Sequence, residues 1–348
     1  MLRLAARAAS ALALASALAL AVTTPALADP PQPAATDIVG VGTDVTEQLF
    51  NQFSTDYNAS LAAAGNTSSP RLYSWDSTGS STITTKAGAT TIARPFNSSA
   101  GITALTSTTS RTVDFSRSDR APQVGDLTTT LFLVMAKDAV SWAAPTGGNA
   151  PASLTNSQLS HIYACSITNW RQIDPALPDA TIRPVLPARG TDTRQSFLRA
   201  LGSWGLPDAV GPCVLDVDRA NQGTDPVLHD PNAVLPYSVG HYVGQAFGGH
   251  TRPGDEPGVL VPRAIDGIPA VDQVNHRINP AFASGAFGHI LYNTVRSFEW
   301  SSTDTHANAL RAVFGPSGWI CRSNDGMSAV RSYGFLPMGP ACGAVVHF

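Results

Sequence analysis

The chain has 348 residues, 43% of them hydrophobic, with 22 basic and 25 acidic side chains. This length exceeds what one compact core usually holds, so we expect a globular protein with two domains or lobes. The charges are scattered and form no basic block, which argues against nucleic-acid binding.

The first 28 residues have the pattern of a secretory signal peptide. Arg3 and Arg7 precede an apolar run at 8–22, and Ala28 ends a small-residue sequence suited to signal peptidase. This run is too short to span a membrane, and no other stretch is long and apolar enough. No cysteine for a lipid anchor follows the cleavage position, so we expect a secreted or periplasmic protein. Its mature chain of 320 residues carries a net charge of −5.

The predicted elements begin after a flexible, Pro-rich segment at 29–37. A buried strand is expected at 38–41, followed by a helix that Thr43 caps and Gly65 ends. Apolar side chains recur at helical spacing along one face of this helix. They are Val45, Leu49, Phe53, Tyr57 and Leu61.

Strands and helices alternate along the following residues. Strands are expected at 71–75, 112–115 and 131–135, and helices at 101–105, at 154–163 and after a polar turn at 189–194. A hydroxyl-rich loop follows the first of these strands, and the Gly/Pro-rich stretch at 247–258 is expected to be a surface loop. The alternation predicts an α/β architecture with largely parallel sheets.

Four cysteines remain in the exported chain, at positions 165, 213, 321 and 342. An even number in this compartment indicates two disulfides, and three pairings are open. The cysteine spacing is not that of a metal site, and the eight histidines are scattered. Sequence patterns of serine hydrolases, zinc proteases and nucleotide-binding loops are absent, so we expect neither a metal nor a cofactor.

Seven segments resemble, in chain order, the phosphate-binding proteins of bacterial ABC transporters, which have the type II periplasmic binding protein fold. The segments are VDFSRSDRAP, LTNSQLSHIYACSITNW, RGTDTRQSF, NAVLPYSVGHYVGQA, AIDGIPA, ILYNTV and SYGFLP. With the strand and helix that begin at residue 38, the resemblance covers nearly all of 38–340. Each motif alone is weak, but their order is specific for the fold.

The resemblance implies two α/β lobes, each a largely parallel sheet flanked by helices, with a ligand cleft between them. Lobe 1 is expected at 38–125 and 236–348, and lobe 2 at 126–235. This division favours the disulfide pairings Cys165–Cys213 and Cys321–Cys342, because each pair then lies within one lobe.

The resemblance also implies a site for a tetrahedral oxyanion, most of all phosphate. Helix N-termini and hydroxyls supply donors for such an anion, and a carboxylate accepts the proton that phosphate retains. The candidate ligand-binding residues that match the family's motifs are Thr43, Asp44, Ser80, Ser81, Ser118, Asp119, Gly190, Thr191, Asp192, Thr193 and Arg194. The structural alternative for each is a helix cap, an ordinary turn or a surface ion pair.

Two positions depart from the family's pattern. Asp192 stands where the family has the middle glycine of its anion-binding turn, and Pro187 stands at the family's upstream arginine. Arg194 is our first choice to replace that arginine, with Arg189 and Arg117 as further candidates. The added carboxylate of Asp192 would crowd the cleft and repel a dianion.

We therefore expect a monomeric, non-catalytic receptor that binds phosphate or a similar oxyanion and serves an ABC permease. A released binding module of the same fold, recognising another anion, a polymer or a protein, is the alternative. A secreted hydrolase that uses Asp and His in the cleft is a remote third interpretation.

Overall fold

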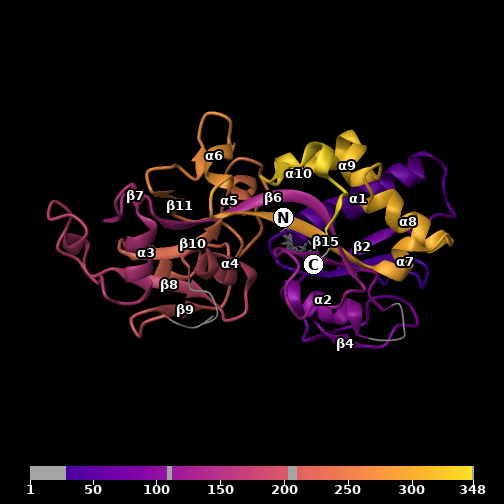
Figure 1. Ribbon diagram of the computed structural model, residues 1–348, viewed down its shortest axis with the longest axis horizontal. Helices are drawn as coiled ribbons and strands as arrows, with labels where there is room; N and C mark the ends of the chain where they lie inside the picture. The colour runs from indigo at the N-terminus through magenta and orange to yellow at the C-terminus, as the bar shows by residue number, and fades with distance from the viewer. Residues whose placement is uncertain (1–28, 108–111, 203–209, 347–348) are drawn as a thin grey trace, which may run out of the picture.

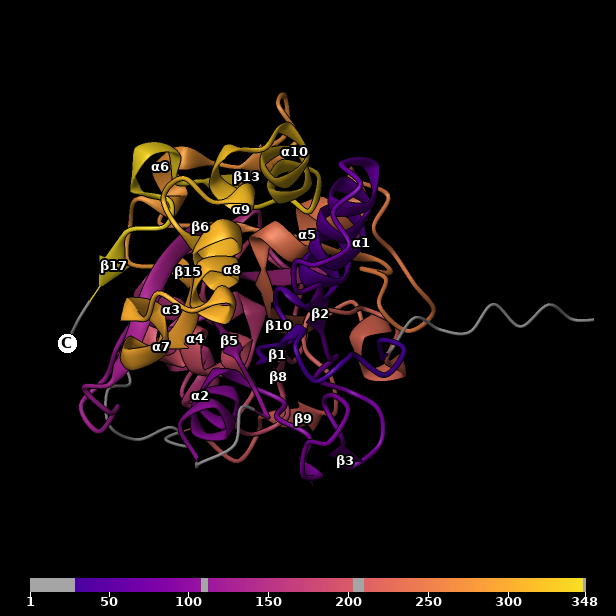
Figure 2. The ribbon, with the colours of Figure 1, turned by 90° about the vertical axis from the view of Figure 1, so that its right-hand side faces the viewer.

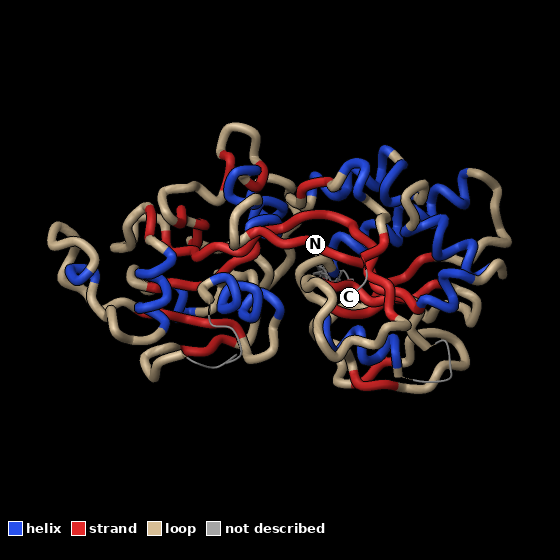
Figure 3. The backbone as a smooth tube through the Cα atoms, viewed as in Figure 1, coloured by secondary structure: helices blue, strands red, loops and turns tan. Residues whose placement is uncertain are grey.

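The computed structural model describes residues 29–107, 112–202 and 210–346. They form two α/β lobes that lie side by side and are joined by long strands (Figures 1 and 3). The predicted signal peptide at 1–28 lies outside the described residues. Within the described ranges, no helix is long and apolar enough to cross a membrane.

Lobe 1 is built from both ends of the chain. Its N-terminal elements are β1 (Ile38–Gly42), α1 (Glu47–Ala63), β2 (Leu72–Ser74), β3 (Thr82–Ile83), β4 (Ile92–Ala93), α2 (Ser98–Thr106) and β5 (Phe115–Ser118). Its C-terminal elements are β15 (Gly288–Arg296), α7 (Ser297–Ser301), α8 (Thr305–Phe314), α9 (Trp319–Arg322), α10 (Asn324–Ser332), β16 (Leu336–Pro337), η3 (Gly339–Ala341) and β17 (Val345–Val346).

Lobe 2 is built from the middle of the chain. Its elements are β7 (Ser153–Leu154), α3 (Asn156–Tyr163), η1 (Trp170–Gln172), β8 (Arg183–Pro187), α4 (Asp192–Ala200), β9 (Leu215–Val217), η2 (Pro226–His229), β10 (Ala233–Ser238), α5 (Val239–Ala246), β11 (Leu260–Pro262), β12 (Ala264–Ile265), β13 (Val271–Asp272), β14 (Arg277–Ile278) and α6 (Pro280–Ala283). The strand β6 (Thr130–Pro145) belongs to both lobes.

One mixed sheet runs through the whole molecule in the order β2-β1-β5-β15-β6-β10-β8-β9. Pairing is parallel at its two ends, from β2 to β5 and from β10 to β9. Pairing is antiparallel at the centre, where β6 pairs with β15 along 130–139 and with β10 along 140–143. The two α/β lobes predicted from the sequence are confirmed.

Each lobe has its own hydrophobic core. In lobe 1, α1 and α8 pack on one sheet face around Phe50, Phe115 and Phe314, while α2 covers the opposite face (Figure 2). In lobe 2, the core surrounds Trp142 and Phe197. The disulfide Cys165–Cys213 lies in lobe 2 and Cys321–Cys342 in lobe 1, the pairing favoured above.

The lobe boundaries differ from those expected from the sequence. Side chains from Val239 to Phe287 pack in the lobe 2 core, although the expected division placed 236–348 in lobe 1. Conversely, Leu131 and Leu133 belong to the lobe 1 core. The physical reason is the length of β6: the chain enters lobe 2 near Asp138 and returns only where β15 begins. The expected strand at 131–135 was only the first part of β6, because Lys137 and Asp138 interrupt the apolar run.

The first helix also begins later than expected. The residues around Asp44 form a turn, and α1 starts at Glu47 with Thr46 as its N-cap residue. Thr43 therefore lies in the turn that precedes the helix. The predicted apolar face is buried through Tyr57, with Leu61 partly buried at its end.

Candidate functional site

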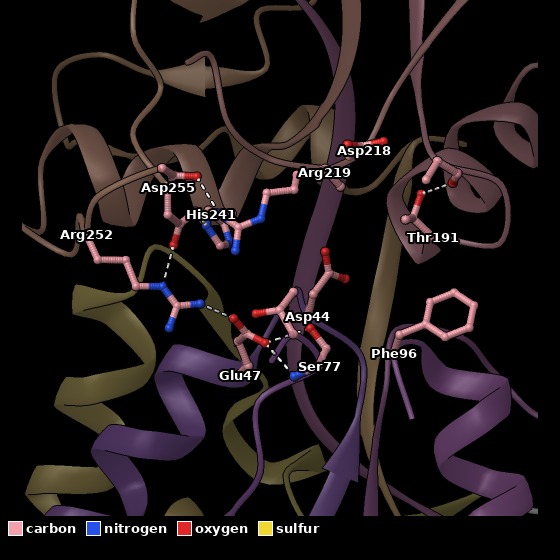
Figure 4. Close-up of a pocket in the computed structure, with 14 residues that line it drawn as sticks. Asp44, Glu47, Ser77, Phe96, Thr191, Asp218, Arg219, His241, Arg252 and Asp255 are labelled. Atoms are coloured by element: carbon pink, nitrogen blue, oxygen red, sulfur yellow. Dashed lines mark hydrogen bonds and ion pairs between the residues drawn. The ribbon is translucent and has the colours of Figure 1, made fainter. Parts of the chain in front are cut away.

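A cavity of about 150 Å³ lies between the lobes (Figure 4). Lobe 1 contributes the turn before α1, the first residue of α1, the loop after β2 and Phe96. Lobe 2 contributes the loops after β8 and β9, α5 and the loop after α5. The lining residues are Asp44, Glu47, Ser77, Thr78, Phe96, Ala188, Thr191, Asp218, Arg219, Ala220, His241, Arg252, Gly254 and Asp255.

The charged groups on one wall of this cavity bind one another across the lobes. Arg252, from the loop after α5, contacts Glu47 and lies 3.0 Å from a carboxylate oxygen of Asp76, both in lobe 1. Asp255 accepts from His241 at 3.0 Å and lies 3.4 Å from Arg252. The loop expected to be a simple surface loop therefore bridges the two lobes.

Asp44 is the exception among these groups. Its Oδ1 atom is buried and has no hydrogen-bond partner among the described residues. Burial raises the pKa of Asp44 to about 7, and the negative charges of Asp192 and Glu47 act in the same direction. The side chain lines the cavity.

A second polar group lies beside the cavity, at the N-terminus of α2. Asn97 caps this helix by accepting a 2.7 Å hydrogen bond from the backbone N–H of Ala100. The backbone N–H of Ser98 donates at 2.8 Å to the Asp192 carboxylate, and the side chains of Thr43 and Ser98 lie close enough to lower the pKa of this carboxylate. We call this place, formed by the backbone N–H of Ser98 and the neighbouring hydroxyls of Thr43 and Ser98, the α2 seat.

The Asp192 carboxylate at the α2 seat lies in a buried, acidic environment. Asp192 is only 3% exposed. Burial and, after it, the charge of Asp119 raise its pKa to about 6, against the opposite effect of the Thr43 and Ser98 polar groups. The helix N-terminus compensates part of this cost, because its backbone N–H groups favour a negative charge.

Two further hydrogen bonds cross between the lobes near the α2 seat. The Asn97 side-chain amide donates to the Gly190 carbonyl at 2.8 Å, and the Ser196 hydroxyl donates to Asp119 at 2.9 Å. Gly190 has φ of +87°, a backbone conformation that glycine adopts easily. The lobes are thus held together by groups of the chain itself.

Asp119 belongs to a buried network with Asp138 and His289, whose ligand-type atoms lie within 4.8 Å of one another. Burial lowers the pKa of His289, but the Asp119 carboxylate, 2.6 Å away, outweighs this effect and raises it to about 9. All four carboxylate oxygens already accept from protein donors: His289 and Ser196 at Asp119, and Ala139, Gly240 and Ser238 at Asp138. We interpret the group as a hydrogen-bonded network that joins β5, β6 and β15.

Four predicted ligand residues are close to the cleft but use their side chains elsewhere. The Thr191 hydroxyl donates to the Ala188 carbonyl, and Thr193 exchanges hydrogen bonds with Asn221. Arg194 contacts the Pro187 carbonyl at 2.8 Å and Asp216 at 2.5 Å, within lobe 2. The Ser118 hydroxyl donates to the Arg120 carbonyl in its own turn.

The remaining candidates are not brought into the site. Ser80 and Ser81 are exposed at the start of the β3–β4 hairpin, where Ser80 bonds Thr82 and Arg94. Arg189 is exposed, and Arg117 is fully buried with its guanidinium on the carbonyls of Gly42, Thr43 and Trp75. The structure therefore groups Thr43, Asp44, Asp119, Gly190 and Asp192, with Thr191 on the cavity wall.

The sequence interpretation missed the serine that lies at the cleft. Ser98 follows Asn97 in the stretch Phe96-Asn97-Ser98-Ser99, a recognisable helix start that was read as beginning at Gly101. Glu47, Ser196, His241, Arg252 and His289 were also missed, because their roles depend on contacts between segments far apart in sequence.

Comparisons with known proteins agree with this architecture. The profile of one family, described as a PBP superfamily domain, matches residues 28–212. No curated protein sequence matches the chain.

Solved structures share the fold at low sequence identity. One is a putative phosphate ABC transporter substrate-binding protein with bound phosphate from Clostridium perfringens, with 13% identity and a TM-score of 0.60 over 87% of this chain and 99% of that one. Another is an ABC-type phosphate transport receptor from Vibrio cholerae, with 17% identity and a TM-score of 0.58 over 86% of this chain and 99% of that one.

Proposed function

The chain belongs to the PBP superfamily, and from this we propose that it is an exported, non-catalytic solute-binding protein whose ligand occupies the cavity between its lobes. Both lobes contribute residues to the wall of the cavity, which supports this proposal. A ligand that contacts both lobes favours the closed arrangement, because it makes more contacts in that arrangement. An ABC permease is the proposed partner, with release as a free binding module as the alternative.

The chemistry of the cavity favours a small solute that carries a protonated amine. Four carboxylates line it, those of Asp44, Glu47, Asp218 and Asp255. Of the cations on its wall, Arg252 and His241 contact Glu47 and Asp255, and Arg219 donates to the Gly254 carbonyl, so the carboxylates outnumber the cations. The single observation that carries the proposal is this excess of carboxylates on the cavity wall, which suits an ammonium group.

Phosphate remains the second candidate, and the solved structures of phosphate receptors with the same fold favour it. The charges of the residues that line the cavity argue against phosphate. Of the two arginines that line the cavity, Arg252 contacts Glu47 and Arg219 donates to the Gly254 carbonyl, so a phosphate dianion would find Arg219 outweighed by the four lining carboxylates.

The proposal has a pH signature. The pKa of Asp44 is raised to about 7, and a bound cation would stabilise its ionised form. Asp192, Glu47, His241 and Asp119 are the other charges that act on it. Amine binding should therefore strengthen as the pH rises from 6 to 8 and should release a proton.

Calorimetric titration of the mature protein with ethanolamine, putrescine, inorganic phosphate and sulfate tests this function. We expect one-to-one binding of an amine, lost in Asp44→Asn, and no heat from phosphate or sulfate. Asp179→Asn is the matched control, because this exposed carboxylate pairs with Arg171 on the surface. One-to-one phosphate binding by the wild type would overturn the amine assignment and return the protein to oxyanion capture.

A further inference from the structure

The α2 seat carries an inference of its own. We propose that the Asp192 carboxylate is a built-in ligand of the α2 seat, which excludes free phosphate and sulfate and holds the two lobes together. The proposal makes Asp192 a residue that determines specificity and closure.

The first step is that Asp192 does not serve its own helix. It is the first residue of α4, a position where a carboxylate commonly interacts with the N-terminus of its own helix. Instead, its Oδ2 accepts from Ser98, 94 residues away, at the N-terminus of α2. The N-cap residue of α4, Thr191, makes no side-chain capping bond either.

The second step is that Asp192 uses the donors that a free oxyanion would need. The backbone N–H of Ser98 donates to it, and the hydroxyls of Thr43 and Ser98 lie close enough to lower its pKa. The Ser98 Oγ also accepts from the backbone N–H of Asp119 at 2.8 Å, which fixes the position of the Ser98 side chain. A carboxylate and a phosphate oxygen are interchangeable as acceptors at a helix N-terminus, so the two compete for the same place.

The third step is the balance of charge around the α2 seat. Asp44 and Asp119 are the other acidic groups that act on this region. The nearby cations already have partners: His289 contacts Asp119, Arg194 contacts Asp216, and Arg117 contacts backbone carbonyls. A further dianion beside Asp192 would add repulsion that these cations do not offset.

The fourth step connects the α2 seat to the relative position of the lobes. Ser98 and Thr43 belong to lobe 1, whereas Asp192 belongs to lobe 2, so the buried carboxylate spans the cleft. Two further hydrogen bonds connect the lobes beside it: Asn97 of lobe 1 donates to Gly190 of lobe 2, and Ser196 of lobe 2 donates to Asp119 of lobe 1. A receptor of this fold closes when a ligand contacts both lobes, and here the chain supplies such a contact itself.

The test is titration of Asp192→Gly with inorganic phosphate, compared with the wild type. Glycine removes the carboxylate and leaves room at the α2 seat, so we expect one-to-one phosphate binding at least about a hundredfold tighter than in the wild type. Asp218→Asn is the charge control, because it removes a carboxylate from the cavity wall and leaves the α2 seat filled. Asp192→Asn is the occupancy control, because its amide oxygen still accepts from Ser98.

Three outcomes would overturn the proposal: phosphate binding by the wild type, no phosphate binding by a folded Asp192→Gly, or equal binding by Asp192→Asn and Asp192→Gly. Folding is checked by circular dichroism, and Asp192→Ser replaces the glycine variant if that one does not fold.

NMR spectroscopy of the wild type is a further test. The amide resonance of Ser98 should not move when phosphate is added. A phosphate-dependent shift of this resonance would contradict occupancy by Asp192. No phosphate binding by a folded Asp192→Gly would overturn this proposal alone, loss of amine binding would overturn the amine assignment alone, and phosphate binding by the wild type would overturn both.

Discussion

The carboxylate of Asp192, at the start of α4 in lobe 2, accepts a 2.8 Å hydrogen bond from the backbone N–H of Ser98, at the start of α2 in lobe 1. Two helices from different lobes are thus connected through one side chain. The contact joins residues that are 94 positions apart, and the carboxylate is almost completely buried. Its raised pKa has a consequence for stability that can be measured directly.

The protein should be more stable at pH 5 than at pH 8.5. The pKa values of Asp44, Asp76 and Asp192 are raised from 3.8 to about 7, 6 and 6 by burial and neighbouring carboxylates. The folded state then binds more protons than the unfolded state between these values, so the free energy of unfolding falls as the pH rises through this range. His289, with its pKa raised to about 9, contributes stability below pH 6.5 that is lost as the pH rises through 9.

Calorimetry at both pH values measures this difference. Each unit of pKa displacement corresponds to about 1.4 kcal/mol, and we expect a Tm roughly 5 °C higher at pH 5. Asp44→Asn should reduce the difference, since the pKa of Asp44 is raised further than those of Asp76 and Asp192. A Tm that rises toward pH 8.5 would contradict the assignment.

Arg252→Gln should destabilise the protein far more than a matched surface substitution. Removal of the guanidinium takes away a positively charged partner of the Glu47 and Asp76 carboxylates, whose side chains are only 5% and 1% exposed. We expect a loss of about 3 kcal/mol in urea denaturation at pH 8. The loss should be smaller at pH 5, because Asp76 can then be protonated. Arg171→Gln, which breaks an exposed pair with Asp179, should cost less than about 1 kcal/mol.

Asn97→Ala should loosen the lobes as well as weaken α2. The Asn97 side chain caps α2 and also donates to Gly190 in the other lobe. Loss of the cap costs about 1 kcal/mol. Loss of the cross-lobe bond should increase the radius of gyration measured by small-angle X-ray scattering. Thr155→Ala removes the capping box of α3 within lobe 2, so it should lower stability without changing the radius. Identical scattering for both variants would argue against a closing role for Asn97.

The two disulfides should contribute unequally to stability. Cys165 and Cys213 are separated by 48 residues, and Cys321 and Cys342 by 21. A longer closed loop restricts the unfolded chain more, which gives about 4 kcal/mol for the first bond and about 3 kcal/mol for the second. Double Ser variants of each pair, compared by urea denaturation, check the order. A larger loss for the second pair would contradict this account.

Much of the fold could be predicted from the sequence, because local patterns determine it. The apolar spacing of Leu49, Phe53 and Tyr57 predicted the buried face of α1, and the ordered motifs predicted the two-lobed α/β architecture. The length of β6 could not be predicted, because Lys137 and Asp138 interrupt its apolar run. Asp138 is tolerated there since Ser238 and Gly240 satisfy its carboxylate, a contact across about 100 residues that no local pattern encodes.

The site was less predictable than the fold. The sequence singled out Asp192 as a departure from the family's pattern, yet only the structure shows what its carboxylate contacts. Thr193 and Arg194 matched the family's motif, but their side chains bond Asn221 and Asp216 within lobe 2. Residue type and spacing thus located the turn, whereas the direction of each side chain depended on partners elsewhere in the chain.

The covalent attachment of Asp192 changes the kind of competition that a free anion faces. A group tethered next to its binding place acts at an effective concentration, which for short connections is in the millimolar range or above. Micromolar phosphate in the surroundings would therefore be outcompeted by a carboxylate that cannot diffuse away. Dilution empties the binding site of an ordinary receptor, but it leaves the occupancy of the α2 seat unchanged.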